Sequence, residues 1–527
     1  MLIFYPVEIY ESVLQQCLQQ GITNFVLCPG ARNAPLVLSL QRTEGLELYY
    51  HPDERSASFF ALGRTMSFDE PCAVITTSGT AVAECLPAVI EAHYQARPLV
   101  IISADRPESY RGTGAPQSID QVGLFSHYAH YGRDFLPGES PFTDWSGRTP
   151  LHINVPLQEQ FDQEQILPLP LKEIGEFKPL KESFDGSLIV DFIKSRSFTG
   201  LVLMIGGLRP HEREAVYHLA DTLQVPVIAD PHSGLREALA DFLVLQPEQT
   251  LAQEPPGKVL RLGEVPHGRY WRDLENDSSI EVLSVCNSGY AGLSRESQVI
   301  KGDVGRIISG IGEQSPIGDV LDHLENEQSS RNTVDELLEA FPSSEPGLLR
   351  ALSIHVTMGE SLYLGNSLPI REWSSFAQRD VPLADIWANR GANGIDGQIA
   401  TWLGTTREVE NAWCIVGDLT ALYDLNALAM QDQIDLSGRR LVIINNGGGQ
   451  IFTHLPRLQS ISNEEQERFT QSHDTSFQHY AQMWGWDYLR ATTPEDLDEQ
   501  SDYEGALLIE IIPDPAETEQ FWQALKR

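Results

Sequence analysis

Short apolar runs recur along the chain, and helix-like segments follow them. Segments such as 80–95 and 419–433 are rich enough in Ala, Leu and Glu, and long enough, to form helices. Continuous apolar strands that alternate with helices form parallel sheets covered on both faces. The chain is therefore predicted to be an α/β protein with parallel sheets flanked by helices. The strand-like runs lie at 23–28, 72–76, 99–103, 201–205, 225–229, 413–416, 441–444 and 507–512.

These runs fall into three blocks. A chain of 527 residues suggests about three domains at roughly 150 residues each. A stretch containing Pro and Lys, 167–185, separates the first two blocks, and the polar stretch 324–347 separates the last two. We therefore predict domains at residues 1–180, 181–335 and 336–527.

The charge balance limits the partners of this chain. It has 37 basic and 74 acidic side chains, a net charge of −37, and only seven of the basic residues are lysines. A broad nucleic-acid-binding surface is not expected, because phosphate backbones require dense positive charge. Lysine-based covalent chemistry is excluded from most of the chain. Any anionic ligand must be held by local arginines or backbone N–H groups.

Cysteine usage and hydropathy bear on location. The six cysteines are scattered, with no Cys-x-x-Cys pair and no zinc-like spacing. No apolar run approaches the roughly 20 residues of a membrane span. The first six residues lack the basic segment and apolar core of a signal peptide. We therefore expect a cytoplasmic protein with reduced thiols and no membrane span.

A possible metal and diphosphate site lies in the last block. Asp418 directly follows one strand-like run, and Asn446 follows the next, 28 residues later. This spacing fits one strand–helix–strand crossover, which would bring both residues to the carboxyl ends of parallel strands. A carboxylate, an amide oxygen and a glycine-exposed carbonyl suit Mg²⁺, and the glycines of 447–449 allow close approach to phosphate. Taken alone, either half is better explained as an ordinary turn or loop.

A candidate acid lies in the first block. Glu54 follows the strand-like run 46–50 and precedes the helical segment 56–65. It can also be read as a helix N-terminal residue stabilised by the helix dipole. Ser78 and Gly79 precede the next helix, where they can line a ligand site or serve as a plain N-cap.

The Gly-Asp and Asn-Asn pair resembles the signature of thiamin-diphosphate-dependent enzymes. The resemblance implies thiamin diphosphate and Mg²⁺ or Mn²⁺ as cofactors, with Asp418, Asn446 and the Gly448 carbonyl as metal ligands. Because the gap is slightly longer than is usual in that family, Asn445 and Gly447 remain alternatives. Glu54 would be the catalytic acid that faces N1′ of the aminopyrimidine and activates the cofactor.

Further motifs narrow this resemblance. They cover both terminal thirds in order, whereas the middle third matches loosely. Together they resemble the family of 2-succinyl-5-enolpyruvyl-6-hydroxy-3-cyclohexene-1-carboxylate (SEPHCHC) synthases of menaquinone and phylloquinone biosynthesis. That family decarboxylates 2-oxoglutarate and adds the resulting carbanion to isochorismate in a 1,4-addition. Its fold has pyrimidine-binding, central and diphosphate-binding domains. The motifs are 29–36, 77–81, 104–107, 114–121, 365–371, 389–397 and 448–452.

The resemblance also implies a set of site residues. Both substrates are dicarboxylates, and arginine forks match planar carboxylates. Each arginine taken alone is equally well explained by a solvated salt bridge, and the apolar residues by ordinary packing. The implied substrate residues are Arg32, Arg106, Gln117, Ser367, Arg371, Arg390 and Phe452. The implied cofactor residues are Glu54, Ser78, Gly79, Asn393, Ile395, Asp418, Leu419, Asn446, Gly448, Ile451 and Phe452.

Some alternatives stay open. Ala31 and Pro116 replace the Ser and Asn usual in the family, which removes two possible substrate hydrogen bonds. The Gly206-Gly207 turn fits a cofactor-free central domain, but also a weak nucleotide site. Another thiamin-dependent 2-oxoacid decarboxylase or carboligase would share Glu54 and the metal motif, and a non-catalytic cofactor-binding protein would share the fold. The resemblance further implies a homodimer or homotetramer with active sites at the dimer interface.

Overall fold

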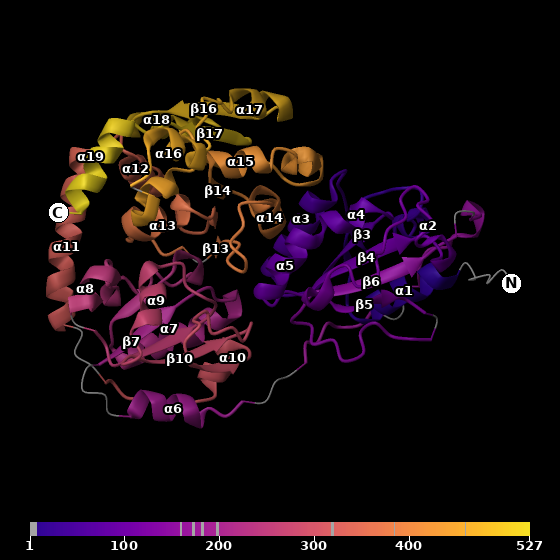
Figure 1. Cartoon of the computed structure of the whole chain (residues 1–527), viewed down its shortest axis with the longest axis horizontal. Helices are drawn as coiled ribbons and strands as arrows, with labels where there is room; N and C mark the ends of the chain where they lie inside the picture. Colours follow the sequence, from indigo (N-terminus) through magenta and orange to yellow (C-terminus); the bar gives the residue numbers. More distant parts are fainter. Residues whose placement is uncertain are drawn as a thin grey trace. The chain divides into compact units, whose positions relative to one another are not determined.

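The computed structural model describes residues 8–136, 138–158, 161–170, 174–180, 184–195, 200–253, 255–317, 321–383, 385–458 and 460–526. The segment 1–6, on which the signal-peptide expectation rests, lies outside the described residues. Three separate sheets, all with parallel strand pairs, follow one another along the chain (Figure 1). This confirms the predicted α/β class with parallel sheets.

The first sheet has six strands in the order β2-β1-β3-β4-β6-β5. Its apolar strands are covered by helices whose inward faces form one buried core. The strands are β1 (Asn24–Leu27), β2 (Glu47–Tyr50), β3 (Cys72–Thr76), β4 (Leu99–Asp105), β5 (His130–Asp134) and β6 (Leu151–Pro156). The helices are α1 (Glu8–Gln19), α2 (Ala34–Gln41), α3 (Glu54–Phe68), α4 (Thr80–Glu84) and α5 (Leu86–Tyr94).

The second sheet has five strands in the order β11-β10-β9-β7-β8. Apolar residues on both of its faces are buried against helices. The strands are β7 (Leu201–Ile205), β8 (Val227–Ala229), β9 (Lys258–Leu262), β10 (Glu281–Cys286) and β11 (Gln298–Lys301). The helices are α6 (Ser187–Lys194), α7 (Arg213–Leu223), α8 (Pro247–Gln253), α9 (Arg269–Asp273) and α10 (Val304–Ser309), with the 3₁₀ turn η6 (Pro231–Ser233).

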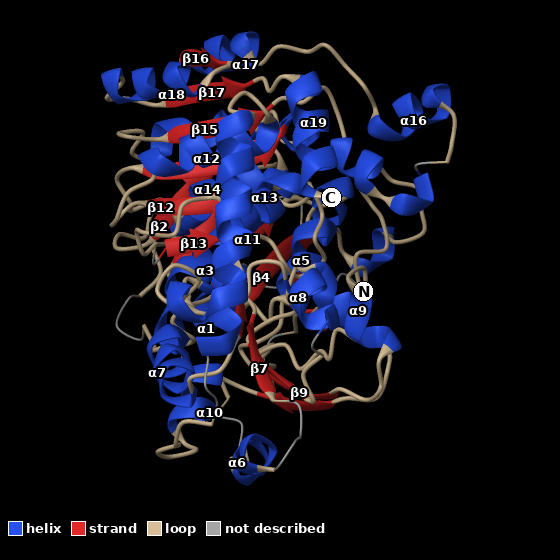
Figure 2. Ribbon diagram, turned by 90° about the vertical axis from the view of Figure 1, so that its left-hand side faces the viewer, coloured by secondary structure: helices blue, strands red, loops and turns tan. Residues whose placement is uncertain are grey.

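The third sheet has six strands in the order β13-β12-β14-β15-β17-β16, seen as a stack of strands in Figure 2. The strands are β12 (Ser361–Leu364), β13 (Asp385–Trp387), β14 (Ala412–Gly417), β15 (Arg440–Ile444), β16 (Asp487–Ala491) and β17 (Leu507–Ile511). The helices are α11 (Leu321–Ala340), α12 (Glu345–His355), α13 (Leu368–Phe376), α14 (Gln398–Thr405), α15 (Asp418–Tyr423), α16 (Asn463–Thr470), α17 (Gln478–Trp484), α18 (Pro494–Asp498) and α19 (Pro515–Leu525). Short 3₁₀ turns include η9 (Ala427–Gln433) and η10 (Gln450–His454).

By its internal contacts the chain divides into two compact units. Unit 1 comprises residues 1–181, 396–408 and 424–435, and unit 2 comprises 182–395, 409–423 and 436–527. Unit 1 therefore holds the first sheet and two inserted segments from the last third, whereas unit 2 holds the other two sheets. The three domains predicted from the sequence stay a prediction.

Within unit 1, the inserted helix α14 packs directly on α3 (Figure 1). A Cβ added at Gly63 would lie 2.2 Å from the carbonyl oxygen of Thr401, and one at Gly404 would lie 2.2 Å from that of Phe60. Such distances are far below van der Waals contact. Glycine is therefore needed at both positions, because the two helix backbones touch.

Two helices expected from the sequence are each interrupted. The segment 80–95 forms α4 and α5, which meet at Cys85 because Pro87 in the first turn of α5 supplies no backbone N–H. The segment 419–433 forms α15 and the 3₁₀ turn η9. Between them the Asp424 carboxylate accepts a hydrogen bond from the Ala400 N–H (3.1 Å), and Asn426 donates to Asp53. Long-range contacts within unit 1 thus override local helix propensity.

All six cysteines are free and buried. Burial raises the pKa of the Cys72 and Cys85 thiols to about 12, so these two are protonated at neutral pH. Across the described ranges, none of the helices is long and apolar enough to cross a membrane.

Candidate cofactor and substrate site

Asp418 and Asn446 lie at the carboxyl ends of neighbouring parallel strands. Strands β14 and β15 pair with Gly417 opposite Ile444, so both site residues follow at the same edge of the third sheet. This confirms the predicted crossover. The Asp418 carboxylate accepts hydrogen bonds from the N–H of Gly448 (2.7 Å) and of Leu419 (2.6 Å). The bond from Gly448 holds the glycine loop, residues 447–449, against the Asp418 carboxylate.

Asn446 presents an unused oxygen to this site. Its Nδ2 donates to both carboxylate oxygens of Glu345, at 3.1 and 2.9 Å. Its Oδ1 is buried and has no hydrogen-bond partner among the described residues. Asn445, in contrast, donates to Glu510 (2.6 Å) and to the Thr475 carbonyl (2.8 Å), which hold it in the fold. A buried amide oxygen without a donor suits a cation, so the geometry favours Asn446 over Asn445 as a metal ligand.

The surroundings of Asn446 are rich in buried carboxyl groups. Burial raises the pKa of Asp418, although the Gly448 N–H and His473, with Nε2 3.3 Å from Oδ2, act in the opposite direction. Burial raises the pKa of Glu345 to about 7. The hydrogen bond from Asn446 acts to lower this pKa, and the charge of Asp418 acts to raise it. Burial and the neighbouring Glu345 also raise the pKa of Glu372 well above its usual value. A divalent cation would stabilise the charged form of these groups, so the donor set fits Mg²⁺.

Position 448 of the glycine loop can hold only glycine. Its φ is +131°, and a Cβ there would lie 2.4 Å from the carbonyl oxygen of Thr470. A cavity of about 930 Å³ in unit 2 is bordered by Asn446 and Gly447. Next to the loop, a Cβ on Gly449 would lie 3.1 Å from the ring of Phe452 and 3.4 Å from Leu419. The predicted apolar residues Leu419 and Phe452 therefore lie together, and the half-buried Ile451 directly precedes Phe452.

In unit 1, Glu54 is the first residue of α3. The preceding residue, Asp53, caps the helix by accepting from the N–H groups of Arg55 (2.8 Å) and Ser56 (3.4 Å). Glu54 is half-buried, and its carboxyl group accepts no hydrogen bond from another described residue. Burial raises its pKa, assisted by the charges of Asp53 and Glu84 and opposed by its own backbone N–H. Capping is thus done by Asp53, which leaves the Glu54 carboxyl available to a ligand.

Ser78 and Gly79 lie at the end of β3, against the loop that carries Gln117. A Cβ on Gly79 would lie 3.1 Å from the Cα of Gln117, which is itself exposed. The Gly79 N–H donates to Oε1 of the buried Gln121 (2.9 Å). Gln121 also donates to Oδ1 of Asn154 (2.9 Å). Gln121 lies in the motif 114–121 but was not predicted as a site residue. In the structure its side chain holds the Gly79 backbone in place.

Two of the predicted substrate arginines also lie in unit 1. Arg32 is buried and donates from Nη1 to the Leu157 carbonyl (3.2 Å). Arg106 is half-buried, donates from Nε to the Pro116 carbonyl (3.0 Å), and lies 5.1 Å from the ring centroid of Tyr110. Because a backbone carbonyl holds Arg106, the unusual proline at position 116 preserves this contact.

The other two arginines lie in unit 2. Ser367 caps α13 with a φ of +77°, and Arg371 donates to the Ser367 carbonyl. Arg390 is buried and donates to Oδ1 of Asn366 (2.8 Å), whose Nδ2 donates to the Gly394 carbonyl (2.8 Å). Asn366 therefore joins the end of β12 to the loop that carries Arg390. That loop also holds the exposed Asn393, at a φ of +62°, and the half-buried Ile395.

Arg371 and Arg390 repel each other and also face the second sheet. Burial and the charges of Arg390 and Arg272 lower the pKa of Arg371 to about 10, whereas Asp230 acts in the opposite direction. Asp230 lies 2.8 Å from Nδ1 of His267. A bound anion would relieve this crowding of positive charge. The middle third matches the family motifs only loosely, so the sequence did not predict Asp230, Arg272 or His267 as site residues.

The Gly206-Gly207 turn has a packing role. A Cβ on Gly206 would lie 1.9 Å from the Glu264 carbonyl oxygen, and one on Gly207 would lie 2.6 Å from the ring of the buried His232. Close contact with the Glu264 backbone and with the His232 ring therefore accounts for the two glycines without a nucleotide.

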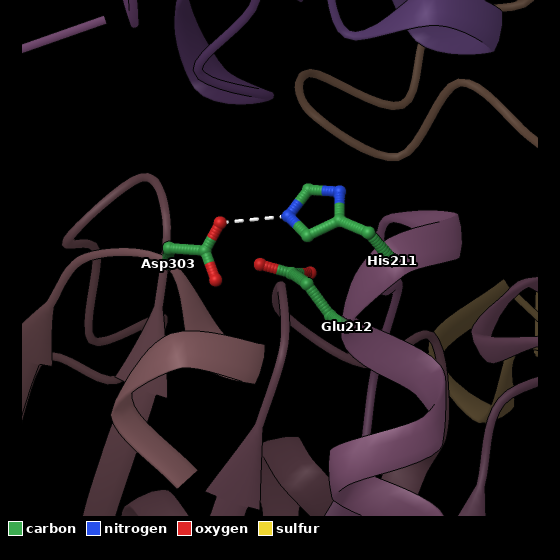
Figure 3. Close-up of side chains that lie close together, drawn as sticks. All are labelled: His211, Glu212 and Asp303. Carbon is green, nitrogen blue, oxygen red and sulfur yellow. Dashed lines mark hydrogen bonds and ion pairs between the residues drawn. The ribbon is translucent and has the colours of Figure 1, made fainter. Parts of the chain in front are cut away.

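A second group of possible metal ligands is formed by His211, Glu212 and Asp303 (Figure 3). His211 Nε2 lies 2.7 Å from Asp303. The buried Glu212 carboxylate accepts hydrogen bonds from the Arg209 N–H (2.8 Å), Asn287 Nδ2 (2.7 Å) and the Val304 N–H (2.9 Å). Glu212 thus already satisfies three donors, and it is best explained as the residue that joins α7 to α10.

Replacing Glu212 with Ala is expected to destabilise unit 2. Three donors would lose their acceptor, and we expect a loss of about 3 kcal/mol in the free energy of unfolding. Urea unfolding followed by circular dichroism measures this loss. Glu214→Ala, at a glutamate of the adjoining helix α7 with 88% side-chain exposure, is the matched control and should change stability little. Equal stability of both variants would contradict the proposed role of Glu212.

Comparisons with known proteins place the chain in a family. Residues 8–124 match the family model described as "Thiamine pyrophosphate enzyme, N-terminal TPP binding domain". The SEPHCHC synthase of Akkermansia muciniphila is 43% identical over 528 residues, covering 98% of both chains. That of Bdellovibrio bacteriovorus is 38% identical, again covering 98% of both. That of Geobacillus thermodenitrificans is 31% identical, covering 89% of this chain and 86% of its own.

The similarity thus spans nearly the whole chain, including the middle third that matched loosely by motif. The region matched by the family model, residues 8–124, includes Glu54. The chain belongs to the family of 2-succinyl-5-enolpyruvyl-6-hydroxy-3-cyclohexene-1-carboxylate synthases.

Proposed function

We propose that this protein decarboxylates 2-oxoglutarate and joins the remaining four-carbon unit to isochorismate by 1,4-addition, as a step of menaquinone or phylloquinone biosynthesis. When bound, thiamin diphosphate supplies the carbanion chemistry for both the loss of CO₂ and the new carbon–carbon bond. The full-length similarity to relatives named for this product supports the reaction. The residues of the chain would bind and orient the cofactor and the substrates, and Glu54 would hold the proton.

The observation that carries this proposal is the buried, unpartnered Oδ1 of Asn446, in a loop whose Gly448 N–H donates to the Asp418 carboxylate. We assign the metal, Mg²⁺ or Mn²⁺, to Asp418, Asn446 and the carbonyl of Gly448. Glu345 would orient Asn446 by accepting both hydrogen bonds from its Nδ2. The glycine loop and the N-terminus of α15 would then face the diphosphate.

Glu54 would hold a proton toward the aminopyrimidine ring of the cofactor. Its raised pKa favours the protonated form, and its carboxyl group accepts no hydrogen bond from another described residue. With the cofactor bound, this carboxyl group would donate a hydrogen bond to N1′ and so act as the acid in its activation. The other cofactor contacts are assigned to Ser78, Gly79, Asn393, Ile395, Leu419, Ile451 and Phe452.

The four arginines would bind the carboxylates of the two substrates. Arg371 and Arg390 form a crowded positive site in unit 2, and Arg32 and Arg106 are each held by a backbone carbonyl. Guanidinium groups fixed in this way can form paired hydrogen bonds to a carboxylate with little further ordering. Gln117, Ser367 and Phe452 complete the proposed substrate contacts.

Isochorismate dependence tests the reaction. The protein is incubated with 2-oxoglutarate, thiamin diphosphate and Mg²⁺, with and without isochorismate, while CO₂ and 2-oxoglutarate are measured. We expect consumption of 2-oxoglutarate to require isochorismate. Equal CO₂ release without isochorismate would instead favour a different thiamin-dependent decarboxylase or carboligase.

Replacing Arg390 with Gln is expected to lower kcat/KM for at least one substrate by about 10- to 100-fold, because a charge-assisted hydrogen bond to a carboxylate is lost. Steady-state kinetics with each substrate varied in turn measures this effect. Arg269→Gln, at an arginine with 68% side-chain exposure, is the control. Wild-type kinetics in a folded Arg390→Gln protein would remove Arg390 from the substrate site.

We also propose a cytoplasmic homodimer or homotetramer, since Glu54 and Asp418 belong to different units of one chain. The resemblance implies that such halves meet between subunits. Light scattering combined with activity measurement tests this assembly. A monomer with full activity would contradict it.

A further inference from the structure

A second cavity, of about 430 Å³, lies in unit 2 away from the residues assigned to the reaction. Its walls come from α8, α11, α12, α13 and α19, and Figure 1 shows α8, α11 and α19 on the same flank. Three arginines line it: Arg331 of α11, Arg350 of α12, and Arg379 directly after α13. Three carboxylates, Glu248, Asp335 and Asp380, also line the cavity, so its charge depends on which of these groups are already paired.

The three guanidinium groups differ in how they are held. Arg350 donates to the Phe376 carbonyl (3.0 Å) and to the half-exposed Asp335 (3.3 Å). Arg331 donates from Nη2 to the Ala240 carbonyl (2.7 Å), and Arg379 donates from Nη2 to the Ser375 carbonyl (2.8 Å). Nε of Arg331 and Nε of Arg379 are both buried and have no hydrogen-bond partner among the described residues. Backbone carbonyls thus hold both arginines in place, while a buried N–H of each still lacks an acceptor.

The local electrostatics favour an anion. Burial and the charges of Arg236, Arg331 and Arg350 lower the pKa of Arg379 to about 9, outweighing the opposite effect of Asp335. Arg236 is itself buried and ion-paired with Glu237. Two further carboxylates line the cavity, but Glu248 accepts from the Tyr270 N–H (3.2 Å) and Asp380 is exposed. Repulsion among guanidinium groups remains, and a bound oxyanion would relieve it.

One side of the same cavity is apolar. Phe376 and Trp522 pack edge to face there, with ring centroids 5.6 Å apart, and Val334 and Leu525 lie beside them. The volume falls within the usual range of small-molecule sites, in which apolar walls surround a few fixed polar groups. An arginine cluster beside an aromatic wall suits a ligand with a charged head and an apolar body.

We propose that this cavity is a binding site for a small organic oxyanion, a carboxylate or a phosphate monoester carried on an apolar group. Arg331 and Arg379 would bind the oxyanion, and Phe376 and Trp522 would contact the apolar group. The site is separate from the proposed reaction site. It lies at the carboxyl end of α13, the helix whose first half carries Arg371.

Calorimetric titration of the full-length protein, loaded with thiamin diphosphate and Mg²⁺, tests this proposal. The probes are phenyl phosphate, benzoate and inorganic phosphate. We expect saturable binding of phenyl phosphate, of benzoate or of both, about tenfold tighter than inorganic phosphate, because the ring is buried. Whichever aryl anion binds more tightly identifies the preferred head group. Binding of neither aryl anion would overturn the proposal.

Variants locate the binding. Arg331→Gln and Arg379→Gln should each weaken it by about tenfold or more, since each removes a charge-assisted hydrogen bond. Arg468→Gln, at an arginine with 77% side-chain exposure, should bind as the wild type does. Arg371→Gln should also retain binding; loss there, with retention in Arg331→Gln and Arg379→Gln, would place the anion in the reaction site and overturn the proposal. If Arg379→Gln fails to fold, the Arg331→Gln variant, at a half-exposed arginine, decides the outcome.

Discussion

Replacing Glu54 with Gln is expected to reduce turnover by about 10²- to 10⁴-fold, the usual contribution of a general acid. The amide keeps the size of the side chain but removes the proton that the carboxyl group would share with the cofactor. Binding of thiamin diphosphate and Mg²⁺ should change little, because the metal is assigned to Asp418 and Asn446. Steady-state rates, together with cofactor affinity from fluorescence quenching, measure the two effects separately.

Glu84→Gln is the matched control for this prediction. Glu84 is exposed on α4, and its charge contributes to the raised pKa of Glu54. The same chemical change there should leave turnover within about twofold, because a surface charge exerts only a weak, screened effect. Full activity in Glu54→Gln would refute the role assigned to Glu54, whatever the control shows.

Replacing Asp418 with Asn is expected to weaken metal-dependent binding of thiamin diphosphate by about 100-fold or more, beyond the usual cost of losing only a supporting contact. The substitution removes the negative charge from a direct ligand. It also places an amide where the Gly448 and Leu419 N–H groups now donate. Titration of the apoprotein with thiamin diphosphate at fixed Mg²⁺ measures the loss, which excess metal should only partly reverse.

Asp474→Asn provides the control for Asp418. Asp474 is exposed and lines the same cavity as Asn446, so the variant changes the charge nearby without touching the assigned ligands. We expect its cofactor affinity to remain at the wild-type level. If the two variants lost affinity equally, general charge in the cavity, and not coordination by Asp418, would explain the effect.

The site at Asp418 and Asn446 shows which features local sequence patterns can predict. Strand ends can be located from apolar runs, and the spacing of Asp418 and Asn446 indicated a crossover between neighbouring strands. The choice between Asn445 and Asn446 could not be made in this way, because adjacent side chains of one loop have the same local signal. It depends on Glu510 and Glu345, which are distant in sequence and hold the two amides differently.

The arginines illustrate the same division. Their place in glycine- and proline-rich motifs singled out Arg32, Arg106, Arg371 and Arg390. The cluster of Arg331, Arg350 and Arg379 follows no motif, since its members come from three segments that only packing brings together. Helix ends behaved similarly: the break at Cys85 has a local cause in Pro87, whereas the one at Asp424 depends on Ala400.

The sequence by itself determined the α/β class, the parallel sheets, the family resemblance and the positions of Glu54, Asp418 and Asn446, because apolar periodicity and motif spacing are local properties of a chain. Only the tertiary structure decided that Gln121 supports Gly79, that Glu345 orients Asn446, and that α14 packs on α3. It alone also revealed a second cluster of arginines. Burial, hydrogen-bond partners and electrostatic crowding depend on residues that are far apart in the chain, so they are defined only once the chain has folded.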